Sequence, residues 1–257
     1  MLLLVRKDLL QAWRTFRLPA LILTGVFFAL LDPLTAKFMP QILGLFGDEL
    51  EGLAEMIPEM GPAEALLSFY GDLIQIAALV LIIIAMGAVA LERERGIAAW
   101  VLTRPVDRGA YLWSKYLALL IGMFIAVAAS GALAIAYTAS LFGSVPLSGA
   151  LWALFFISLF LMLILAVTVT ASAFCRSQLA AGGIGLAFLL AIFLPELLFG
   201  HTELVRYFPH VLSTGHAGHL LSGLEDWTYF IPAAVITLIL AQLCIAVAAH
   251  YFKQAEL

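Results

Sequence analysis

The stretch GALWALFFISLFLMLILAVTVTASAF, residues 149–174, decides the fold because it contains no charged residue. About 20 apolar residues at ~1.5 Å rise per residue are enough to cross the ~30 Å hydrocarbon core of a bilayer. Backbone groups in lipid must be satisfied within the segment, and this run is too long and too uniformly apolar for a barrel strand. The sequence therefore predicts a transmembrane α-helix here.

Similar apolar runs recur along the chain, and together they predict six spans. Their approximate bounds are 18–38, 67–90, 112–141, 149–174, 179–199 and 229–250. The composition agrees, because 64% of the residues are hydrophobic and only 12% are charged, and the mean hydropathy is +1.08. In a soluble domain roughly a quarter of the residues are charged. We expect one all-α polytopic membrane domain over residues 1–257.

Residues 1–17 have the pattern of an amphipathic helix that precedes the first span. Apolar side chains fall at helical spacing on one face, and polar side chains occupy the other. The apolar face comprises Leu2, Val5, Leu9, Leu10, Trp13 and Phe16, and the polar face comprises Arg6, Lys7, Gln11, Arg14 and Arg17. We expect an interfacial helix whose basic face meets anionic lipid, with Pro19 marking the corner into the first span.

Two spans carry closely spaced small residues, which let helix backbones approach one another in lipid. They are Gly122, Ala126, Ser130 and Ala134 in the third span, and Gly182, Gly183 and Gly185 in the fifth. We predict that both sets form helix-packing faces.

Lysine and arginine are distributed unevenly between the loops, and this bias predicts the orientation in the membrane. With the N-terminus inside, eleven of the thirteen basic residues fall on the cytoplasmic side, leaving Lys37 and Arg206 outside. Residues 39–66 contain six acidic residues and no basic residue, together with prolines and glycines, so we expect a solvated external loop there. The predicted location is the cytoplasmic membrane, with both termini in the cytoplasm.

The stretch LERERGIAAWVLTRPVDRGAYLWSK, residues 91–115, places eight charged residues between two apolar runs. Within it, Ile97, Trp100 and Val101 form an i, i+3, i+4 apolar face on a segment too short to span the membrane. The proline that follows disfavours helix in the residue before it, and Asp107 is placed to cap the start of the third span. An exposed apolar face on a short cytoplasmic helix, rimmed by arginine, predicts a partner protein.

In this loop the sequence resembles the permeases of type 2 ATP-binding-cassette exporters. Their second span is followed by E-R-E-x-G, a few mixed residues, then L, P-V-x-R, x-x-Y-L and a lysine. The matching residues are Glu92, Arg93, Glu94, Gly96, Leu102, Pro105, Val106, Arg108, Tyr111, Leu112 and Lys115. The likeness extends more loosely to the N-terminal helix, the six spans and a proline-containing segment after the fifth span. Family members commonly have serine or threonine, which also cap helices, at the position of Asp107.

The resemblance implies a coupling helix around residues 96–103, within a coupling loop at 91–111, that docks into a separate cytoplasmic ATPase subunit. The implied coupling residues are Glu92, Glu94, Gly96, Ile97, Trp100, Val101, Leu102, Pro105 and Arg108. The chain has no G-x-x-x-x-G-K-[ST] loop, so ATP and Mg would be bound by the partner, and the chain itself would be no enzyme and carry no cofactor. Six spans are half of such a transporter, so we expect two permease chains, as a homodimer or a heterodimer.

Ionisable groups inside spans are costly, and they are functional suspects by default. The candidates for a substrate path are Asp32, Asp72, Gln75 and Glu196, whose carboxyl-bearing members lie toward the external ends of their spans. One hypothesis is that they line the exit of the path, because the resemblance implies a path formed mainly by the first, second and fifth spans. The alternative is a structural or snorkelling role, with water or Lys37 satisfying Asp32.

Four of the five histidines lie between the fifth and sixth predicted spans, at positions 201, 210, 216 and 219. His216 and His219 are three residues apart and could share one helical face, as metal ligands often do. Their spacing matches no recognised site. Histidines in a partly buried external hairpin are the commoner explanation, and we therefore expect no metal, with His216 and His219 as the candidates if one is bound.

The leading interpretation is an export permease that partners an ATPase, and two other classes stay open. One is an intramembrane metal-dependent enzyme, although the sequence contains no H-E-x-x-H motif and its glutamate-rich motif lies at the membrane edge. The other is a membrane scaffold, in which the short amphipathic segment would be only a docking site. The net charge of -4 reflects the acidic loop, so it indicates no nucleic-acid partner.

Overall fold

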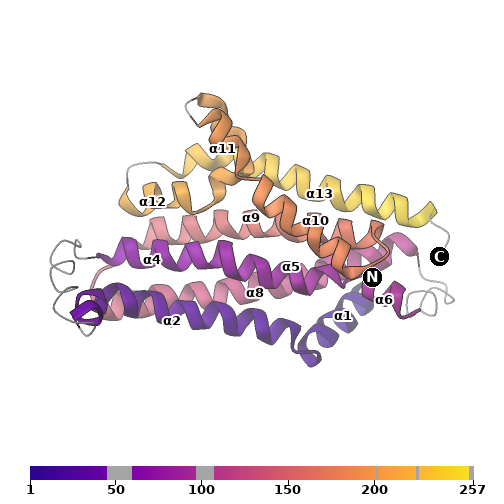
Figure 1. Cartoon of the computed structure of the whole chain (residues 1–257), viewed down its shortest axis with the longest axis horizontal. Coiled ribbons are helices and arrows are strands. Elements are labelled where there is room, and N and C mark those ends of the chain that lie inside the picture. The colour runs from indigo at the N-terminus through magenta and orange to yellow at the C-terminus, as the bar shows by residue number, and fades with distance from the viewer. Residues whose placement is uncertain (45–59, 97–106, 201, 224–225, 255–257) are drawn as a thin grey trace.

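The computed structural model describes residues 1–44, 60–96, 107–200, 202–223 and 226–254, and every regular element in these ranges is helical (Figure 1). The longer helices are α1 (Leu2–Arg14), α2 (Arg17–Gly44), α4 (Pro62–Asp72), α5 (Ala78–Met86), α8 (Arg108–Phe142), α9 (Leu147–Phe174), α10 (Gln178–Ala191), α12 (Thr214–Ser222) and α13 (Ile231–Gln254). The short elements are α6 (Ala90–Glu94), α11 (Leu194–Phe199), the π-helix η1 (Leu73–Ala77), and the 3-10 helices η2 (Glu203–Tyr207), η3 (Pro209–Leu212) and η4 (Trp227–Phe230). The predicted all-α fold is confirmed.

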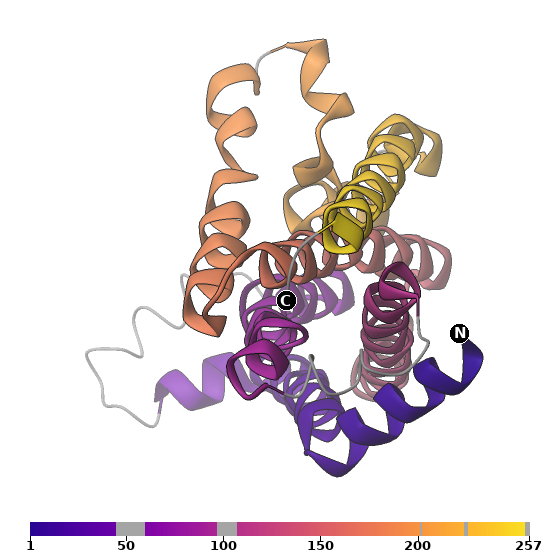
Figure 2. The ribbon, with the colours of Figure 1, turned by 90° about the vertical axis from the view of Figure 1, so that its right-hand side faces the viewer.

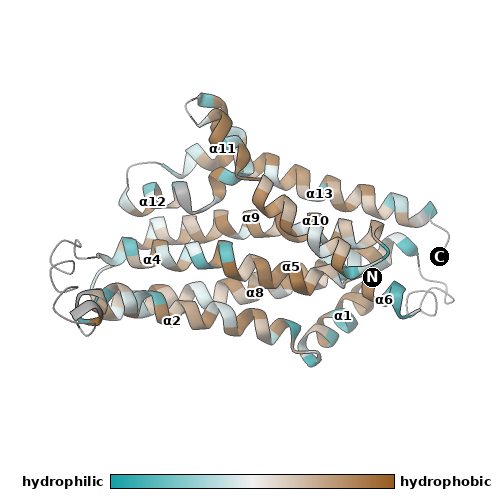
Figure 3. Cartoon of the chain, viewed as in Figure 1, coloured by the Kyte–Doolittle hydropathy of each residue, from teal (hydrophilic) through white to brown (hydrophobic). Residues whose placement is uncertain are grey.

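Six stretches of the described chain are helical, long and apolar enough to cross a membrane. They are Arg17–Met39, Pro62–Glu94, Arg108–Phe142, Leu147–Phe174, Gln178–Phe199 and Trp227–Phe252. Each of them coincides with one of the six predicted runs to within a few residues at either end. Figure 3 shows apolar residues along the bundle and polar residues gathered toward its two ends. The fold is that of a multi-pass membrane protein.

The helix α9 lies at the centre of the bundle, where α5, α8, α10, α12 and α13 all contact it. Viewed along the bundle in Figure 2, α2 and α8 lie on one side of α9, and α10 and α13 lie on the other. Side chains along its middle, such as Phe160 and Leu165, are fully buried. Because neighbours cover several of its faces, α9 has no need of a polar stripe, and this explains its uniformly apolar sequence.

The helices α2 and α8 pack side by side through the small residues predicted for the third span. A Cβ added to Gly122 would come within 2.9 Å of Leu18 Cδ1, so the two helices meet there at close range. Ser130 faces Gly25, whose added Cβ would lie 2.7 Å from Ser130 Oγ. Ala126 between them is buried as well. The prediction of a packing face on the third span is confirmed.

The small residues of the fifth span behave less uniformly. Gly182 lies against Met86, and Gly185 lies against Thr168, where an added Cβ would come within 2.6 Å of Thr168 Oγ1. Gly183, by contrast, has no neighbour from another element within 4 Å of an added Cβ in the described part of the chain. The packing face is therefore confirmed within this chain for Gly182 and Gly185, while Gly183 lies on the exposed side of α10.

The N-terminal helix α1 is separate from the first span, as predicted, but the corner lies at a different residue. The chain turns at Phe16, which has φ +62°, a backbone conformation uncommon for a residue other than glycine. Pro19 lies inside the first turn of α2, where proline is tolerated because the first amide groups of a helix have no intrahelical acceptor. The prediction that Pro19 marks the corner is therefore wrong. The buried residues of α1 are Asp8 and Ala12.

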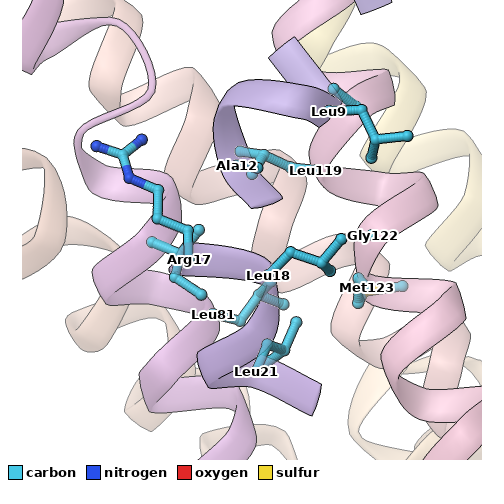
Figure 4. Close-up of a pocket in the computed structure, with 11 residues that line it drawn as sticks. Leu9, Ala12, Arg17, Leu18, Leu21, Leu81, Leu119, Gly122 and Met123 are labelled. Atoms are coloured by element: carbon cyan, nitrogen blue, oxygen red, sulfur yellow. The ribbon is translucent and has the colours of Figure 1, made fainter. Parts of the chain in front are cut away.

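A small apolar pocket lies beside the corner between α1 and α2, lined by residues of both helices and of α5 and α8 (Figure 4). Leu18 and Leu21 of α2 lie among side chains of α1, α5 and α8, while the guanidinium of Arg17 points away from them. The residues that line the pocket on these neighbouring helices include Leu9, Ala12, Leu81, Leu119, Gly122 and Met123. Because its lining is almost entirely apolar, the pocket offers few groups that could recognise a polar ligand.

The predicted loop over residues 39–66 is wrong at both of its ends, which are helical. The helix α2 continues through Gly44, and α4 begins at Pro62. At the start of α4 the carboxylate of Glu64 accepts a hydrogen bond of 2.9 Å from the backbone amide of Gly61, which satisfies one of the free donors of a helix N-terminus. Residues 45–59 lie outside the described residues.

Replacing Gly149 by alanine is expected to lower the free energy of unfolding by about 1–3 kcal/mol, the usual cost of overpacking. An added Cβ would overlap the backbone carbonyl group of Leu220 and lie 3.3 Å from the Cα of Leu221, so α9 and α12 would have to move apart. The matched control is Gly183→Ala, which meets no neighbour and has the higher helix propensity. Thermal unfolding in detergent should show a lower midpoint for Gly149→Ala alone, and equal midpoints would contradict this packing.

Candidate functional site

The charged loop begins and ends at one end of the bundle, the end that also carries both chain termini (Figure 1). A buried lysine, Lys115 of α8, lies at this end between two carboxylates from other elements. Its Nζ lies 3.2 Å from Asp8 Oδ1 of α1, and it forms a closer ion pair with Glu92 Oε1 of α6. All three side chains are at most 10% exposed. We call Asp8, Glu92 and Lys115 the stem network.

Neighbouring polar groups complete the stem network. The hydroxyl of Tyr111 donates a hydrogen bond to Glu92 Oε2, and the hydroxyl of Ser114 donates one of 3.0 Å to Asp8 Oδ2. Lys7, which is partly exposed, lies 3.0 Å from Asp8 Oδ1. Two lysines thus face two carboxylates, and the charges balance. Buried ions are tolerated when they are paired and hydrogen-bonded, as they are here.

The residues that follow Glu92 reach two further spans. Arg93 donates to the backbone carbonyl groups of Ala173 (3.0 Å) and Cys175 (3.3 Å), at the end of α9. Glu94 accepts a hydrogen bond of 2.9 Å from the backbone amide of Gln178, at the start of α10. Three consecutive residues of α6 therefore contact α8, then α9, then α10, and Lys115 of α8 connects the first of them to α1.

The short helix α6 is held in place by Ser172 of α9. The chain breaks its helix after Met86, where α5 ends, and resumes at Ala90. The hydroxyl of Ser172 accepts hydrogen bonds of 3.0 Å from the amides of Val89 and Ala90, and it donates one of 2.7 Å to the carbonyl of Met86. One side chain thus satisfies the backbone groups that the break leaves free.

The structure describes only part of the implied coupling residues. Glu92 is buried in the stem network, Glu94 bonds to the start of α10, and Gly96 follows α6 with φ +70°. Arg108 is the first residue of α8, where Asp107 accepts a hydrogen bond of 2.8 Å from the amide of Ala110 and so caps the helix as predicted. The remaining coupling residues lie outside the described residues: Ile97, Trp100, Val101, Leu102 and Pro105.

In the half of the bundle away from the stem network, two of the four path candidates lie on neighbouring helices. Asp32 in α2 and Asp72 at the end of α4 are close enough to interact electrostatically, and Asp32 Oδ2 is buried without a hydrogen-bond partner among the described residues. The π-helix η1 follows directly, and Gln75 lies on it with an exposed side chain. Single π-turns inside longer helices are frequently found at functional sites. Nothing in the sequence pattern had indicated this π-turn.

The other residues named with this cluster lie elsewhere. Lys37 donates a hydrogen bond of 2.7 Å to the carbonyl of Leu141 and lies 4.9 Å from the ring centre of Phe142, and among the described ion pairs none joins it to Asp32. The fourth path candidate, Glu196, is on α11, which Figures 1 and 2 show on the other side of the bundle from α2. Glu196 Oε2 lies 2.7 Å from His210 Nε2.

The structure brings together the two histidines named from their spacing, but only one of them, His216, belongs to its cluster of possible metal ligands. The rings of His216 and His219 do meet edge to face, with centroids 5.8 Å apart. The group whose ligand atoms lie within 4.8 Å of one another is however Glu196, His210 and His216, without His219. These three residues come from three separate elements, so sequence spacing could not reveal them.

Asp8 was not among the site residues predicted from the sequence. It is the lone acidic residue in an otherwise basic N-terminal helix, and this was the available signal. An acidic side chain among basic ones is normally explained by the solvated face of a helix. Here it faces the bundle and is 7% exposed.

Fold and site together define a polytopic α-helical membrane protein with a buried ion network beside a polar loop. Residues 44–257 match the family described as "Protein of unknown function (DUF2705)", and the chain belongs to this family. It is also similar to the "Uncharacterized transmembrane protein YxlG" of Bacillus subtilis (strain 168), with 26% identity over 221 residues, covering 84% of this chain and 86% of that protein.

Proposed function

We propose that this chain is the permease subunit of an ATP-binding-cassette exporter and works with a separate cytoplasmic ATPase subunit. The observation that carries the proposal is the stem network, because it ties the entry of the charged loop to α1 and α8. The loop also contains the residues that resemble the exporter motif. In this proposal residues 97–106 hold the docking surface, and the N- and C-termini lie in the cytoplasm.

The stem contacts suggest how force applied at the loop would reach the spans. Glu92, Arg93 and Glu94 hold α6 to α8, α9 and α10 by polar contacts, and Lys115 of α8 links Glu92 to Asp8 of α1. Packed interiors transmit displacement because they have few voids. A shift of the loop driven by nucleotide binding in the partner would therefore move α6 together with α1, α8, α9 and α10. ATP and Mg would be bound by the partner alone.

The proposal also assigns the opposite end of the bundle and the second permease chain. Asp32, Asp72 and Gln75 would line the exit of the substrate path, and Glu196 drops out of this group because its contacts are with histidines. A second permease chain would complete the transporter. The fifth span fits such a role, because α10 buries only Ala181, Gly185 and Leu189 within the chain.

Affinity purification of the tagged full-length chain from membranes of its source organism tests this function. We expect a protein with a G-x-x-x-x-G-K-[ST] loop to co-purify, and the complex to hydrolyse ATP. The control chain has residues 97–106 replaced by a glycine-serine linker of equal length, and it should insert normally but lose the ATPase. Absence of such a partner, or its equal retention by the control, would contradict the proposal.

A further inference from the structure

Three metal-ligand side chains converge where the segment that follows the fifth span folds back against the end of that span. Glu196 is on α11, His210 is on η3 and His216 is on α12. Both imidazoles direct Nε2 at the same carboxylate oxygen, Glu196 Oε2, at 2.7 Å for His210 and 3.8 Å for His216. Among the described residues, no lysine or arginine lies within ion-pair distance of this carboxylate.

The two histidines are held in a largely dry setting. His210 is 2% exposed, and the Nδ1 atoms of His210 and His216 are both buried without a hydrogen-bond partner among the described residues. Aromatic rings flank both imidazoles: the ring centroids of Phe208 and His210 are 6.0 Å apart, and those of Tyr229 and His216 are 6.2 Å apart. The hydrogen bond between His210 and Glu196 satisfies one nitrogen of the His210 ring. It does not explain why Nε2 of His216 also approaches the same carboxylate oxygen.

We propose that Glu196, His210 and His216 bind one Zn²⁺ ion. Two imidazole nitrogens and one carboxylate oxygen are a common ligand set for zinc, usually completed by water. Bond lengths of about 2.0–2.2 Å place tetrahedral ligand atoms about 3.3–3.6 Å apart. The spacings of 2.7 and 3.8 Å lie on either side of that range, so small side-chain adjustments would admit the ion.

Zinc at this position would act as a clamp. The three ligands belong to elements that connect α10 to α13, and η3 packs against α9 and α13. A single ion would fix α11 to η3 and α12, and so would set the shape of the segment beside the end of the bundle. This role is independent of the exporter proposal, because it needs neither an ATPase nor a transported substrate.

Zinc titration of the full-length chain, purified in detergent and stripped of metal, tests the proposal. We expect one equivalent of Zn²⁺ to bind and to raise the thermal unfolding midpoint, since binding to the folded state stabilises it. Glu196→Gln should weaken binding by more than about tenfold, because the loss of even a supporting hydrogen bond around a metal ligand typically costs about 10–100-fold. Glu196 is 52% exposed, so this change should leave folding intact.

The histidine variants identify the ligands. His210→Gln and His216→Gln should weaken zinc binding as strongly as Glu196→Gln, whereas the matched control His219→Gln should bind zinc as the unaltered chain does. Circular dichroism and size-exclusion chromatography establish that each variant is folded before titration. The proposal is overturned if the unaltered chain binds no zinc, if folded Glu196→Gln binds it normally, or if His219→Gln abolishes binding.

Discussion

Replacing Lys115 by methionine is expected to destabilise the folded protein by about 3–5 kcal/mol, the usual cost of removing one partner from a buried ion pair. The methionine would leave the carboxylates of Asp8 and Glu92 facing one another in the bundle without their shared cation. Uncompensated charge in a poorly solvated site is among the few causes of large mutational effects. Thermal unfolding in detergent, followed by circular dichroism, measures the loss.

A triple variant separates the loss of charge pairing from the loss of packing. Lys115→Met combined with Asp8→Asn and Glu92→Gln removes all three charges and keeps the side-chain volumes, so we expect most of the stability to return. Lys37→Met is the matched control, because Lys37 is in a span and, among the described residues, contacts only a backbone carbonyl and an aromatic ring, so its loss should cost about 0.5–1.5 kcal/mol. A midpoint for Lys115→Met as high as that of Lys37→Met would show that the stem network is not a buried ion pair in the membrane.

Stability alone does not explain the stem network, because buried ion pairs contribute little net stability. An apolar cluster of the same volume would often be as stable or more stable. What the ions add here is a specific arrangement of partners. Glu92 can satisfy its charge only when α6 lies against both Tyr111 and Lys115, and Asp8 does the same for α1. A loop attached to such a stem has few alternative positions.

The secondary structure was readable from the sequence because each span is dominated by one physical requirement. An apolar run in lipid must satisfy its backbone internally, so the six runs had to be helices, whatever their neighbours. The cap at Asp107 was equally local, because its carboxylate accepts a hydrogen bond from the amide of Ala110, only three residues along the chain. Close packing at Gly122 followed from the spacing of small residues on one helix face.

The parts that could not be read from the sequence depend on which helices become neighbours. Lys115 and Asp8 are joined across more than a hundred residues, and no local pattern pairs an N-terminal acid with a lysine of the third span. The electrostatic interaction between Asp32 and Asp72 could not be predicted for the same reason. The corner at Phe16 requires a positive φ, which nothing in the sequence predicts. Pro19 nearby is a residue type that often marks a corner, but here it lies inside the helix.

Under the proposed function, replacing Trp100 by glutamate is expected to uncouple the chain from the ATPase subunit. In the proposed function Trp100 is at the centre of the apolar docking face, and aromatic residues at interface centres commonly contribute 2 kcal/mol or more. Losing about 2 kcal/mol weakens binding about 30-fold, and the buried carboxylate adds a desolvation cost. The measurement is ATP hydrolysis by the partner subunit with increasing amounts of permease, both reconstituted in vesicles.

The conservative variant Trp100→Phe is the matched control, since it keeps an aromatic ring in the docking face and should retain most of the stimulated hydrolysis. Both variants should reach the membrane in normal amounts, because the substituted residue lies between the second and third spans and belongs to neither. Normal stimulation by Trp100→Glu would disprove the docking assignment. Loss of stimulation by Trp100→Glu with stimulation preserved in Trp100→Phe would instead tie the loop, and through Glu92 the stem network, to the work of an ATPase outside the membrane.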